Sequence, residues 1–322
     1  MRAMPALAPI VAFLVALFAA RLLLTPAGRR IALDKPNERS LHAQPVPRTG
    51  GIAIAAGIAA GCALVWPGLP VILLAAAALA AVSFADDVLG LPTLVRLALH
   101  FAAAVAVLAL DLEVTAPLLF VVLALALAWT ANLYNFMDGA DGLAGGMAVF
   151  GFGAYGLAAY LSGAATLAAL CASIAAASAA FLVFNWHPAR LFMGDVGSVP
   201  VGFLAGALGL RGWLVGIWPL WFPLLVFAPF MCDATLTLLK RLVRRERVWQ
   251  AHREHYYQRL VRMGFGHRGA ALIEYVAMAA CAAVALAVLR QPAPMQAYTL
   301  ALAFAALAAV AVWIDVRWGR RP

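Results

Sequence analysis

The chain has 322 residues, of which 66% are hydrophobic and 11% are charged, with a mean hydropathy of +0.94. A soluble globular protein is nearer half apolar and a quarter charged, so this composition excludes a water-soluble enzyme, a disordered chain and a fibre. A net charge of +9 would suggest nucleic-acid binding in a soluble protein. In a polytopic membrane protein, Lys and Arg gather in cytoplasmic loops, and no nucleic-acid partner is expected.

Apolar stretches that could cross a membrane recur along the whole chain. A span needs about 20 apolar residues. The candidate stretches are 5–24, 50–66, 69–85, 93–110, 116–134, 143–162, 164–184, 198–210, 213–239, 270–289 and 296–316. The first is longer than the core of a signal peptide and is expected to be retained. Prolines in 213–239 predict a kink or break there. The expected fold is all-α, with about 11 transmembrane helices.

The basic residues divide unequally between the two sides of this arrangement. Of the 23 Lys and Arg, 19 fall in alternate loops or in the tail after 316, whereas Arg2, Arg211 and Arg290 fall on the other side. The positive-inside rule therefore predicts an outer N-terminus and a cytoplasmic C-terminus. We expect residues 1–322 to form a single transmembrane domain. Its cytoplasmic loops would be 25–49, 86–96, 135–142, 185–197 and 240–268.

The 14 acidic residues are informative because a carboxylate in hydrocarbon costs roughly 2.5–3.5 kcal/mol on insertion scales. Seven, including Glu254 and Asp315, are expected to be ordinary solvated charges. Five others follow the third, fifth and seventh spans and should share one depth on the cytoplasmic face. These five are Asp86, Asp87, Asp138, Asp141 and Asp195. Their loops hold few Lys or Arg, so a divalent cation and a phosphorylated substrate would relieve their mutual repulsion.

The neighbours of these acids favour the same chemistry. Asp138 and Asp141 lie among glycines, close in sequence to Asn132 and Asn135, and Asp195 follows another glycine. Glycine lets the backbone approach a ligand closely. Carboxylate and amide oxygens suit Mg²⁺, which uses one or two carboxylates together with phosphate oxygens and water. We therefore expect phosphate chemistry at the cytoplasmic membrane surface, with Mg²⁺ as the cofactor and Mn²⁺ as the alternative ion.

Five motifs occur in order along the chain. They are DKPNERSLHAQPVPRTGG at 34–51, DDVLG at 86–90, NLYNFMDGADGLA at 132–144, FNWHPARLFMGDVGS at 184–198 and HREHYYQRLVRMGFGH at 252–267. In these motifs and its span number the chain resembles the bacterial polyprenyl-phosphate N-acetylhexosamine-1-phosphate transferases of glycosyltransferase family 4. Their superfamily includes the phospho-N-acetylmuramoyl-pentapeptide transferase. The resemblance implies a multi-pass enzyme of the bacterial inner membrane with its active site facing the cytoplasm.

The resemblance implies transfer of an N-acetylaminosugar-1-phosphate from a UDP-sugar to polyprenyl phosphate, which releases UMP. Members specific for N-acetylglucosamine usually carry His-x-His-His in the fifth motif, whereas this chain reads His255-Tyr256-Tyr257-Gln258. That departure is more similar to the branch that starts O-antigen lipopolysaccharide with 6-deoxy sugars such as N-acetylfucosamine or N-acetylquinovosamine. The alternative is an N-acetylglucosamine-1-phosphate transferase for enterobacterial-type or teichoic-acid glycans. Peptidoglycan precursor synthesis is disfavoured.

Roles for individual residues also follow from the resemblance. The implied catalytic residues are Asp86, Asp87, Asp195 and His255, with Asp195 and Asp87 as metal ligands and Phe192 stacked on uracil. The implied substrate-binding residues are Asn132, Asn135, Asp138, Asp141, Phe192, Arg48, His252 and Arg253. His42 of the first motif is a further candidate.

A transporter and a non-catalytic scaffold are the alternatives to a transferase. An ion-coupled transporter also carries intramembrane acids, but it places them near the midplane between inverted repeats. Here the acids lie at one edge, and the sequence shows no repeat. A non-catalytic scaffold predicts loss of the motif aspartates, and all five are present. A homodimer is compatible with the sequence, which does not fix the oligomeric state.

Overall fold

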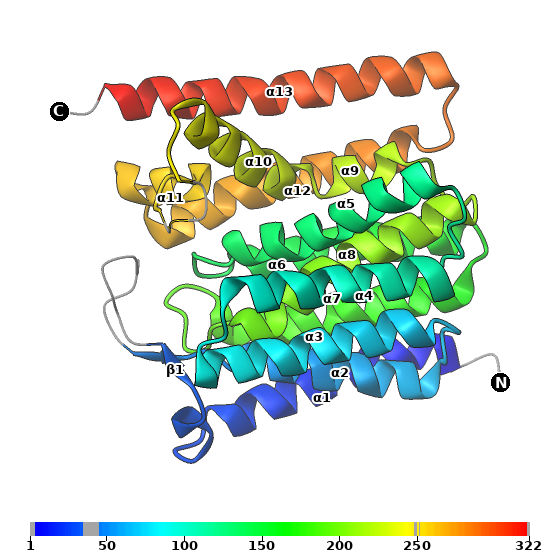
Figure 1. Ribbon diagram of the computed structural model, residues 1–322, viewed down its shortest axis with the longest axis vertical. Coiled ribbons are helices and arrows are strands. Elements are labelled where there is room, and N and C mark those ends of the chain that lie inside the picture. Colours follow the sequence, from blue (N-terminus) through cyan, green and yellow to red (C-terminus); the bar gives the residue numbers. More distant parts are fainter. Residues whose placement is uncertain (1–3, 35–44, 248–249, 251, 321–322) are drawn as a thin grey trace.

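The structure is a computed structural model that describes residues 4–34, 45–247, 250 and 252–320, with only the backbone of residues 87 and 88. The long helices lie side by side in one bundle, and the two ends of the chain lie at opposite ends of it (Figure 1). The helices are α1 (Met4–Leu23), α2 (Gly50–Leu64), α3 (Pro70–Leu89), α4 (Thr93–Leu110), α5 (Pro117–Phe136), α6 (Leu143–Leu161), α7 (Ala165–Asn185), α8 (Asp195–Leu214), α9 (Trp221–Val226), α10 (Ala228–Val243), α11 (Tyr256–Leu260), α12 (Gly266–Val288) and α13 (Ala293–Gly319). Short helical turns occupy η1 (Gly28–Arg30) and η2 (Val261–Phe265), and β1 (Leu33–Asp34) pairs antiparallel with β2 (Val46–Pro47).

Within the described ranges, seven helical segments are long and apolar enough to cross a membrane. They comprise α1, α4, α5, α6, α7, the continuous segment from α11 to α12, and α13. Shorter apolar helices cover Gly50–Leu64 and Pro70–Asp86. The predicted all-α, polytopic membrane fold is confirmed. Each of the eleven predicted stretches is largely helical, whereas eleven crossings and the orientation stay predictions.

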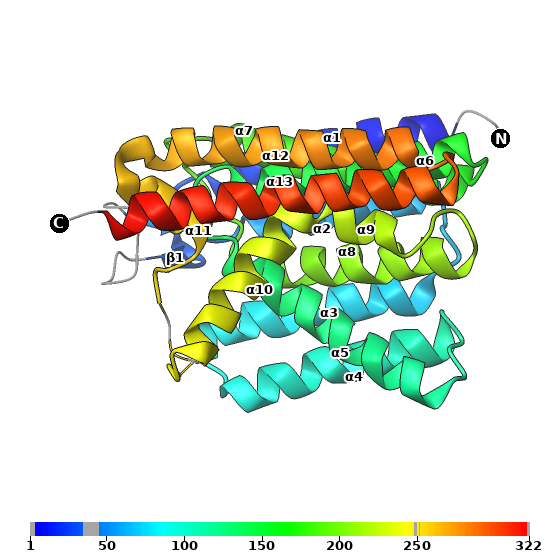
Figure 2. The same ribbon diagram turned by 90° about the horizontal axis from the view of Figure 1, so that it is seen from above.

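The predicted break in 213–239 is found between α9 and α10. The two helices meet at Phe227, and Pro229 lies in the first turn of α10. Proline is tolerated there because the first turn of a helix leaves its N–H groups without intrahelical partners. After the break α10 runs obliquely to the neighbouring long helices (Figure 2). Its last turns therefore reach the end of the bundle where α11 lies.

Several motif residues lie within helix ends rather than in loops. Asp86 and Asp87 are in the last turn of α3, Asn132 and Asn135 are near the end of α5, and Asp195 is the first residue of α8. The boundaries predicted from hydropathy were therefore short by a turn. A helix continues past its apolar run because its backbone bonds do not depend on side-chain polarity. The side chains of Asp86, Asn132, Asn135 and Asp195 consequently project from regular, fixed positions.

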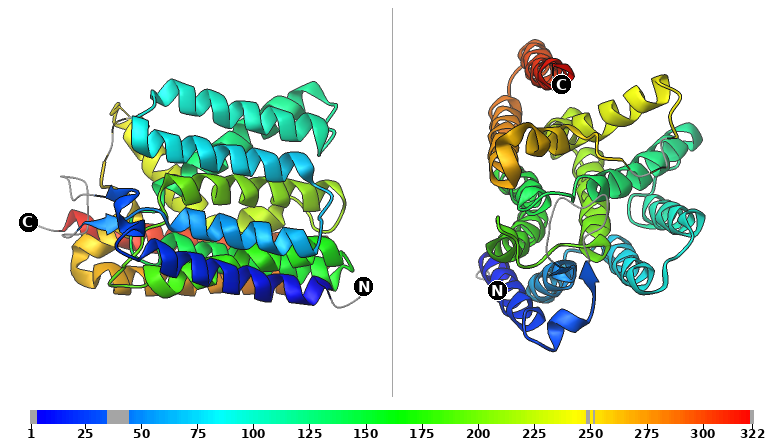
Figure 3. Two further views of the ribbon diagram at one scale, coloured as in Figure 1. Left: turned by 90° about the horizontal axis from the view of Figure 1, so that it is seen from below. Right: turned by 90° about the vertical axis from the view of Figure 1, so that its left-hand side faces the viewer.

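Small residues let the helices of the bundle approach closely. A Cβ on Gly57 of α2 would lie 2.6 Å from the carbonyl oxygen of Ala12 in α1. Such small-residue contacts are the usual packing device between membrane helices, since lipid supplies no hydrophobic drive to bring them together. By contrast, α13 lies outermost (Figure 3). Among its described residues only Ile314 is buried.

Candidate active site

The first and fourth motifs are joined through their backbones. The amide of Phe192 donates to the carbonyl of Pro47 at 2.8 Å, and the amide of Gly50 donates to the carbonyl of Phe192 at 2.8 Å. Gly194 follows with φ of +69° and ψ of 168°, a conformation open essentially to glycine alone. A Cβ there would lie 2.3 Å from the carbonyl oxygen of Arg48. The close approach places Arg48 beside the start of α8.

The third motif is pinned to the same region. Gly142 has φ of +79°, and its amide donates to Asn185 Oδ1 at 2.9 Å. Its carbonyl accepts a 2.7 Å hydrogen bond from the Tyr275 hydroxyl on α12. Asn185 also donates to the carbonyl of Leu191 at 2.9 Å, so one buried amide side chain joins the third and fourth motifs. Asp141 is thereby fixed between the two loops.

These loops enclose a cavity of about 770 Å³ at one end of the bundle. Its lining draws on the first, third, fourth and fifth motifs, which are far apart in the sequence. The predicted residues that line it are Arg48, Asn132, Asn135, Asp138, Asp141, Phe192, Asp195, His252 and His255. Their proximity makes the predicted site geometrically possible, and their individual roles stay predictions.

Asp195 is oriented by a short chain of hydrogen bonds. Asn135 donates from Nδ2 to Asp195 Oδ2 at 3.2 Å and accepts at Oδ1 from the Ser198 hydroxyl at 2.7 Å. The half-buried Asp138 lies close enough to respond to it. Burial, and then the Asp195 carboxylate, raise the pKa of Asp138 to about 7. Two carboxylates that oppose each other's ionisation form an oxygen-rich donor set that suits Mg²⁺.

Asp86 is connected to this site through Arg96, which contacts both Asp86 and Asp195. Its carboxylate accepts from the amide of Leu91 at 2.6 Å and from Arg96 Nη1 at 2.9 Å. The same Arg96 nitrogen lies 3.8 Å from Asp195 Oδ2. The expectation that the acidic cluster lacks cationic partners is therefore wrong, because the first turn of α4 directs Arg96 back toward α3. The signal in the sequence was that Arg96 is the only basic residue of the loop 86–96.

Two predictions fall partly outside what the structure describes. The side chain of Asp87 is outside the described atoms, so its assignment as a metal ligand stays a prediction. Residues 35–44 of the first motif, including His42, are also outside the described residues.

Asp141 lies between two histidines. His187 Nδ1 is 2.6 Å from Asp141 Oδ2, and His267 Nδ1 is 3.4 Å from Asp141 Oδ1. The two imidazole rings are nearly parallel, with centroids 5.4 Å apart. Within the described part of the chain, these three residues are the one group of three whose candidate ligand atoms all lie within 4.8 Å of one another. Two imidazoles favour a transition metal over Mg²⁺.

Hydrogen bonds alone account for the arrangement of Asp141, His187 and His267, without a bound metal ion. The Asp141 amide lies 3.2 Å from His267 Nδ1, and the Asp141 carboxylate also accepts from the Ala189 amide at 3.1 Å. In the sequence, His187 is only one residue of the fourth motif, followed by Pro188, and His267 is only the last residue of the fifth motif. Both imidazoles meet at one carboxylate on the cavity wall, and His267 itself lines the cavity. They are residues that sequence reasoning undervalued.

His255 is held by a buried aspartate of α10. His255 Nδ1 lies 3.1 Å from Asp233 Oδ1, which also accepts from the amide of Tyr256 at 2.9 Å. The second oxygen of Asp233 accepts from the amide of Tyr257 at 2.9 Å. Asp233 thus caps the start of α11 and orients His255 at once. No local signal could identify it, because it lies 22 residues before the histidine.

Tyr257 and Gln258, which stand where N-acetylglucosamine-specific enzymes usually carry histidine, stabilise the segment that carries His255. Tyr257 donates from its hydroxyl to the carbonyl of Phe136 at 3.2 Å. Gln258 accepts from the His255 amide at 3.2 Å and donates to the Tyr257 hydroxyl at 3.1 Å. Gln258 also lines the cavity. The substitution therefore changes the site's polar surface directly.

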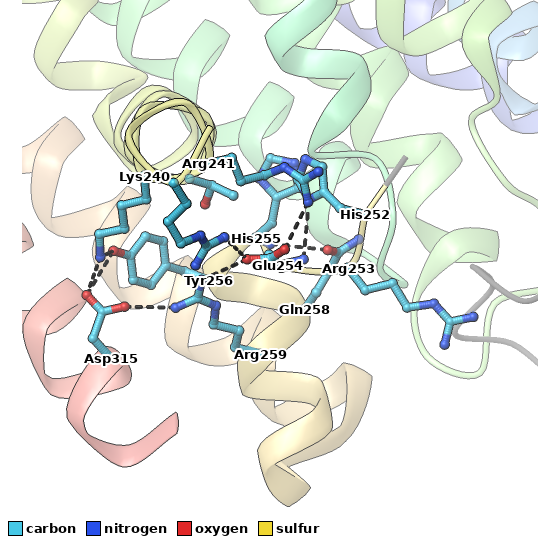
Figure 4. A network of polar contacts seen from close by, with 12 residues as sticks. Lys240, Arg241, His252, Arg253, Glu254, His255, Tyr256, Gln258, Arg259 and Asp315 are labelled. Atoms are coloured by element: carbon cyan, nitrogen blue, oxygen red, sulfur yellow. Dashed lines mark hydrogen bonds and ion pairs between the residues drawn. The ribbon is translucent and has the colours of Figure 1, made fainter. Parts of the chain in front are cut away.

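The remaining residues of the fifth motif differ in their placement. The imidazole centroid of His252 lies 4.8 Å from that of His255. Burial, and then the neighbouring His255, lower the pKa of His252 to about 4, so it is neutral at pH 7. Figure 4 shows Arg253 extending away from the polar network around Glu254, and it does not line the cavity. A substrate contact from Arg253 stays a prediction that this arrangement does not favour.

Comparison with known proteins agrees with the motif pattern. Residues 69–212, which include α3 to α8 and most of the acidic site, match the model of glycosyl transferase family 4. Over this stretch the chain is similar to glycosyl transferase family 4. A probable undecaprenyl-phosphate N-acetylglucosaminyl 1-phosphate transferase of Bacillus subtilis is 28% identical over 83% of this chain and 81% of that protein. An undecaprenyl-phosphate alpha-N-acetylglucosaminyl 1-phosphate transferase of Yersinia pestis is 29% identical over 80% and 78%.

A shorter match extends the relationship across the superfamily. A phospho-N-acetylmuramoyl-pentapeptide-transferase of Symbiobacterium thermophilum is 41% identical over 39% of this chain and 36% of that protein. Similarity to these transferases favours an enzyme over a transporter or a non-catalytic scaffold. It also agrees with a multi-pass membrane protein.

Proposed function

We propose that this protein transfers an N-acetylaminosugar-1-phosphate from a UDP-sugar to polyprenyl phosphate, giving polyprenyl-diphospho-sugar and UMP. The observation that carries the proposal is a single cavity with two chemically different walls. One wall holds Asp138, Asp141, Asp195 and the guanidinium groups of Arg48 and Arg96. The other is apolar, so a charged headgroup and a hydrocarbon chain could be bound together.

The apolar wall comes from helices that face the membrane. Its side chains are Leu97 of α4, Leu125, Trp129 and Phe136 of α5, and Leu238 of α10. Of these, Leu97, Leu125 and Phe136 are exposed on the surface of the bundle. A lipid phosphate could enter between these helices with its chain in the bilayer, while a water-soluble nucleotide sugar enters from the loop side. That geometry suits a reaction between one lipid and one soluble substrate.

The donor set supports Mg²⁺ as the ion. Asp195 and Asp138 would hold it, with Asp87 as a third candidate, because the carboxylates of Asp138 and Asp195 repel each other without a cation. When bound, the ion would neutralise charge on the phosphate oxygens. Arg48 and Arg96 would bind phosphate oxygens from the other side, since guanidinium forms paired hydrogen bonds with phosphate.

The chain's own residues mainly position the substrates. Phosphoryl transfer needs in-line placement and charge stabilisation more than covalent help. Phe192 offers an aromatic face in the cavity wall for the uracil, and Asn132 is fixed by a 3.0 Å contact with His100. His255 would donate a hydrogen bond to a phosphate oxygen while Asp233 holds its other nitrogen. His252 beside it is neutral at pH 7 and adds no positive charge there.

The identity of the sugar is a finer proposal. The named relatives act on N-acetylglucosamine. Gln258 in the cavity, where the N-acetylglucosamine enzymes usually carry histidine, favours a 6-deoxy sugar such as N-acetylfucosamine or N-acetylquinovosamine and hence a role in O-antigen initiation. N-acetylglucosamine is the alternative. The active site would face the cytoplasm of the inner membrane, and a homodimer is the simplest oligomer to test.

The decisive experiment measures UMP release by the purified protein in nanodiscs. Undecaprenyl phosphate, Mg²⁺ and a panel of UDP-N-acetylaminosugars would be supplied, and mass spectrometry would identify the lipid product. We expect UMP release that Asp195→Asn abolishes and that EDTA stops. Glu113→Gln, an exposed acid at the other end of α4, is the matched control and should retain full activity. Wild-type protein that releases no UMP with any sugar would refute the proposal.

A further inference from the structure

Helix α13 carries its one buried side chain, among its described residues, at the end near the active site. Ile314 packs there with Tyr256 and Leu260 of α11. Elsewhere α13 exposes large apolar side chains such as Leu302. A carboxylate on such a helix is costly unless it is paired. Asp315, one residue beyond Ile314, is therefore a position whose partners need to be explained.

Asp315 is held by side chains from two other helices (Figure 4). One carboxylate oxygen accepts from Lys240 of α10 and from the Tyr256 hydroxyl at 3.2 Å. The other accepts from Arg259 Nη1 at 2.8 Å. Lys240 and Arg259 also lie over the Tyr256 ring, 5.0 and 5.2 Å from its centroid. Asp315, expected from the sequence to be an ordinary solvated charge, instead joins α10, α11 and α13.

The network continues from Arg259 toward the active-site loop. Arg259 Nη2 lies 3.8 Å from Glu254 Oε2, and its side chain is only 6% exposed. Glu254 also accepts from Arg241 Nη1 at 2.9 Å and from Arg244. The main-chain amide of Glu254 donates to His252 Nδ1 at 3.4 Å. A continuous set of charged contacts therefore runs from α13 to the segment that carries His252 and His255.

This arrangement suits a brace because α12 does not hold α11 as part of one regular helix. Helix α11 has five residues and is joined to α12 through η2, where Gly264 has φ of +98° and a non-helical backbone. Asp233 caps its start, and Asp315 and Glu254 compensate the buried charge of Arg259 near its end. Without Asp315, Lys240 and Arg259 would be like charges brought together, and an uncompensated buried charge is strongly destabilising.

We propose that Asp315 of α13 is a positioning residue, which holds α11 and the segment 252–255 so that His255 faces the cavity. Asp315 does not line the cavity, so it acts through other residues rather than on the substrates. The inference rests on the proposed function for its effect on turnover. Its structural half, the bracing of segment 252–260, can be measured independently.

The test compares Asp315→Asn with Asp315→Glu and with Arg317→Gln, a charge change two residues away on the same helix. Hydrogen–deuterium exchange of the protein in nanodiscs would report on the segment 252–265. We expect faster exchange there in Asp315→Asn, with α6 and α7 unchanged, and near wild-type exchange in the other two variants. Equal exchange in Asp315→Asn and wild type would overturn the bracing role.

UMP release by the same variants tests the link to turnover. We expect kcat to fall about tenfold in Asp315→Asn, the scale seen when an outer residue that orients a functional histidine is lost. The KM for the UDP-sugar should change much less, and Asp315→Glu should recover most of the rate. In a His255→Asn background the Asp315→Asn effect should largely disappear. An equal loss in both backgrounds would overturn action through His255.

Failure of the proposed function would be separately visible. A wild-type protein that releases no UMP from any UDP-sugar refutes the transferase assignment and with it the effect on kcat. The exchange measurement would still decide whether Asp315 braces the segment. Unchanged kcat despite faster exchange would refute the positioning role alone.

Discussion

Replacing Asp233 by asparagine tests whether the buried carboxylate of α10 organises the fifth motif. Asparagine keeps the shape but supplies one acceptor oxygen instead of two. That oxygen would stay with the donors on the Oδ1 side, the Tyr256 amide and the Thr237 hydroxyl at 2.9 and 3.2 Å. The new NH₂ group would then face the amide of Tyr257, which now donates to Oδ2 at 2.9 Å.

The expected loss can be worked out from these contacts. A hydrogen bond to a charged group contributes about 1.5–3 kcal/mol, and here one is replaced by a donor facing a donor in a buried site. We therefore expect Asp233→Asn to lower the free energy of unfolding by about 2 kcal/mol. His255 keeps an acceptor oxygen at Oδ1 but loses the negative charge beside its imidazole, and losses of about 10–100-fold are the scale for removing a carboxylate that orients a functional histidine.

The assay is UMP release at saturating UDP-sugar, with denaturant unfolding of the same preparation as the stability measurement. Thr237→Val is the matched control because it removes one donor to the same carboxylate and leaves the contacts of His255 and Tyr257 in place. It should keep kcat within about twofold. An Asp233→Asn protein with wild-type kcat and stability would refute the capping argument.

Three further predictions concern other parts of the site. Gly194→Ala should lower the free energy of unfolding by at least about 2 kcal/mol, because an alanine backbone is strained at φ of +69° and its Cβ would lie 2.3 Å from a backbone atom. Gly153→Ala, with open space around it, is the control and should leave the free energy of unfolding unchanged. Arg96→Gln should lower kcat/KM for UMP release about tenfold, since two carboxylates lose their shared cation, and wild-type kcat/KM would contradict this. Burial would raise the pKa of Glu254, but its arginine partners outweigh that effect and hold the pKa below its ordinary 4.5. The stabilisation from Glu254 is therefore present above pH 4.5 and is lost as the pH falls further. In Glu254→Gln, the free energy of unfolding should fall less steeply with decreasing pH in this acidic range.

The helical membrane fold was largely predictable because it rests on composition. Each of the eleven apolar stretches became helix, and the prolines of 213–239 marked the break at Phe227. Helix ends were less predictable. The α8 helix begins at Asp195 rather than at 198, since polar residues continue a helix once its backbone bonds are formed.

The candidate site was predictable where glycine-rich motifs carry the acids. Asp138, Asp141 and Asp195 do line one cavity with Asn132 and Asn135. The surrounding counter-charges were not predictable, because a side chain on another helix supplies each of them. Arg96 was counted only toward the charge of a loop, although it bridges two carboxylates.

The sequence by itself determined that this is a helical membrane protein and that its scarce acids gather in family motifs. Hydropathy and motif order are local properties, and they survive in any packing of the helices. Only the tertiary structure decided which charges are paired. Asp233 with His255, and Asp315 with Arg259, are joined across 22 and 56 residues. Such pairs depend on how separate helices pack, and no spacing of motifs along the chain encodes which residues will meet.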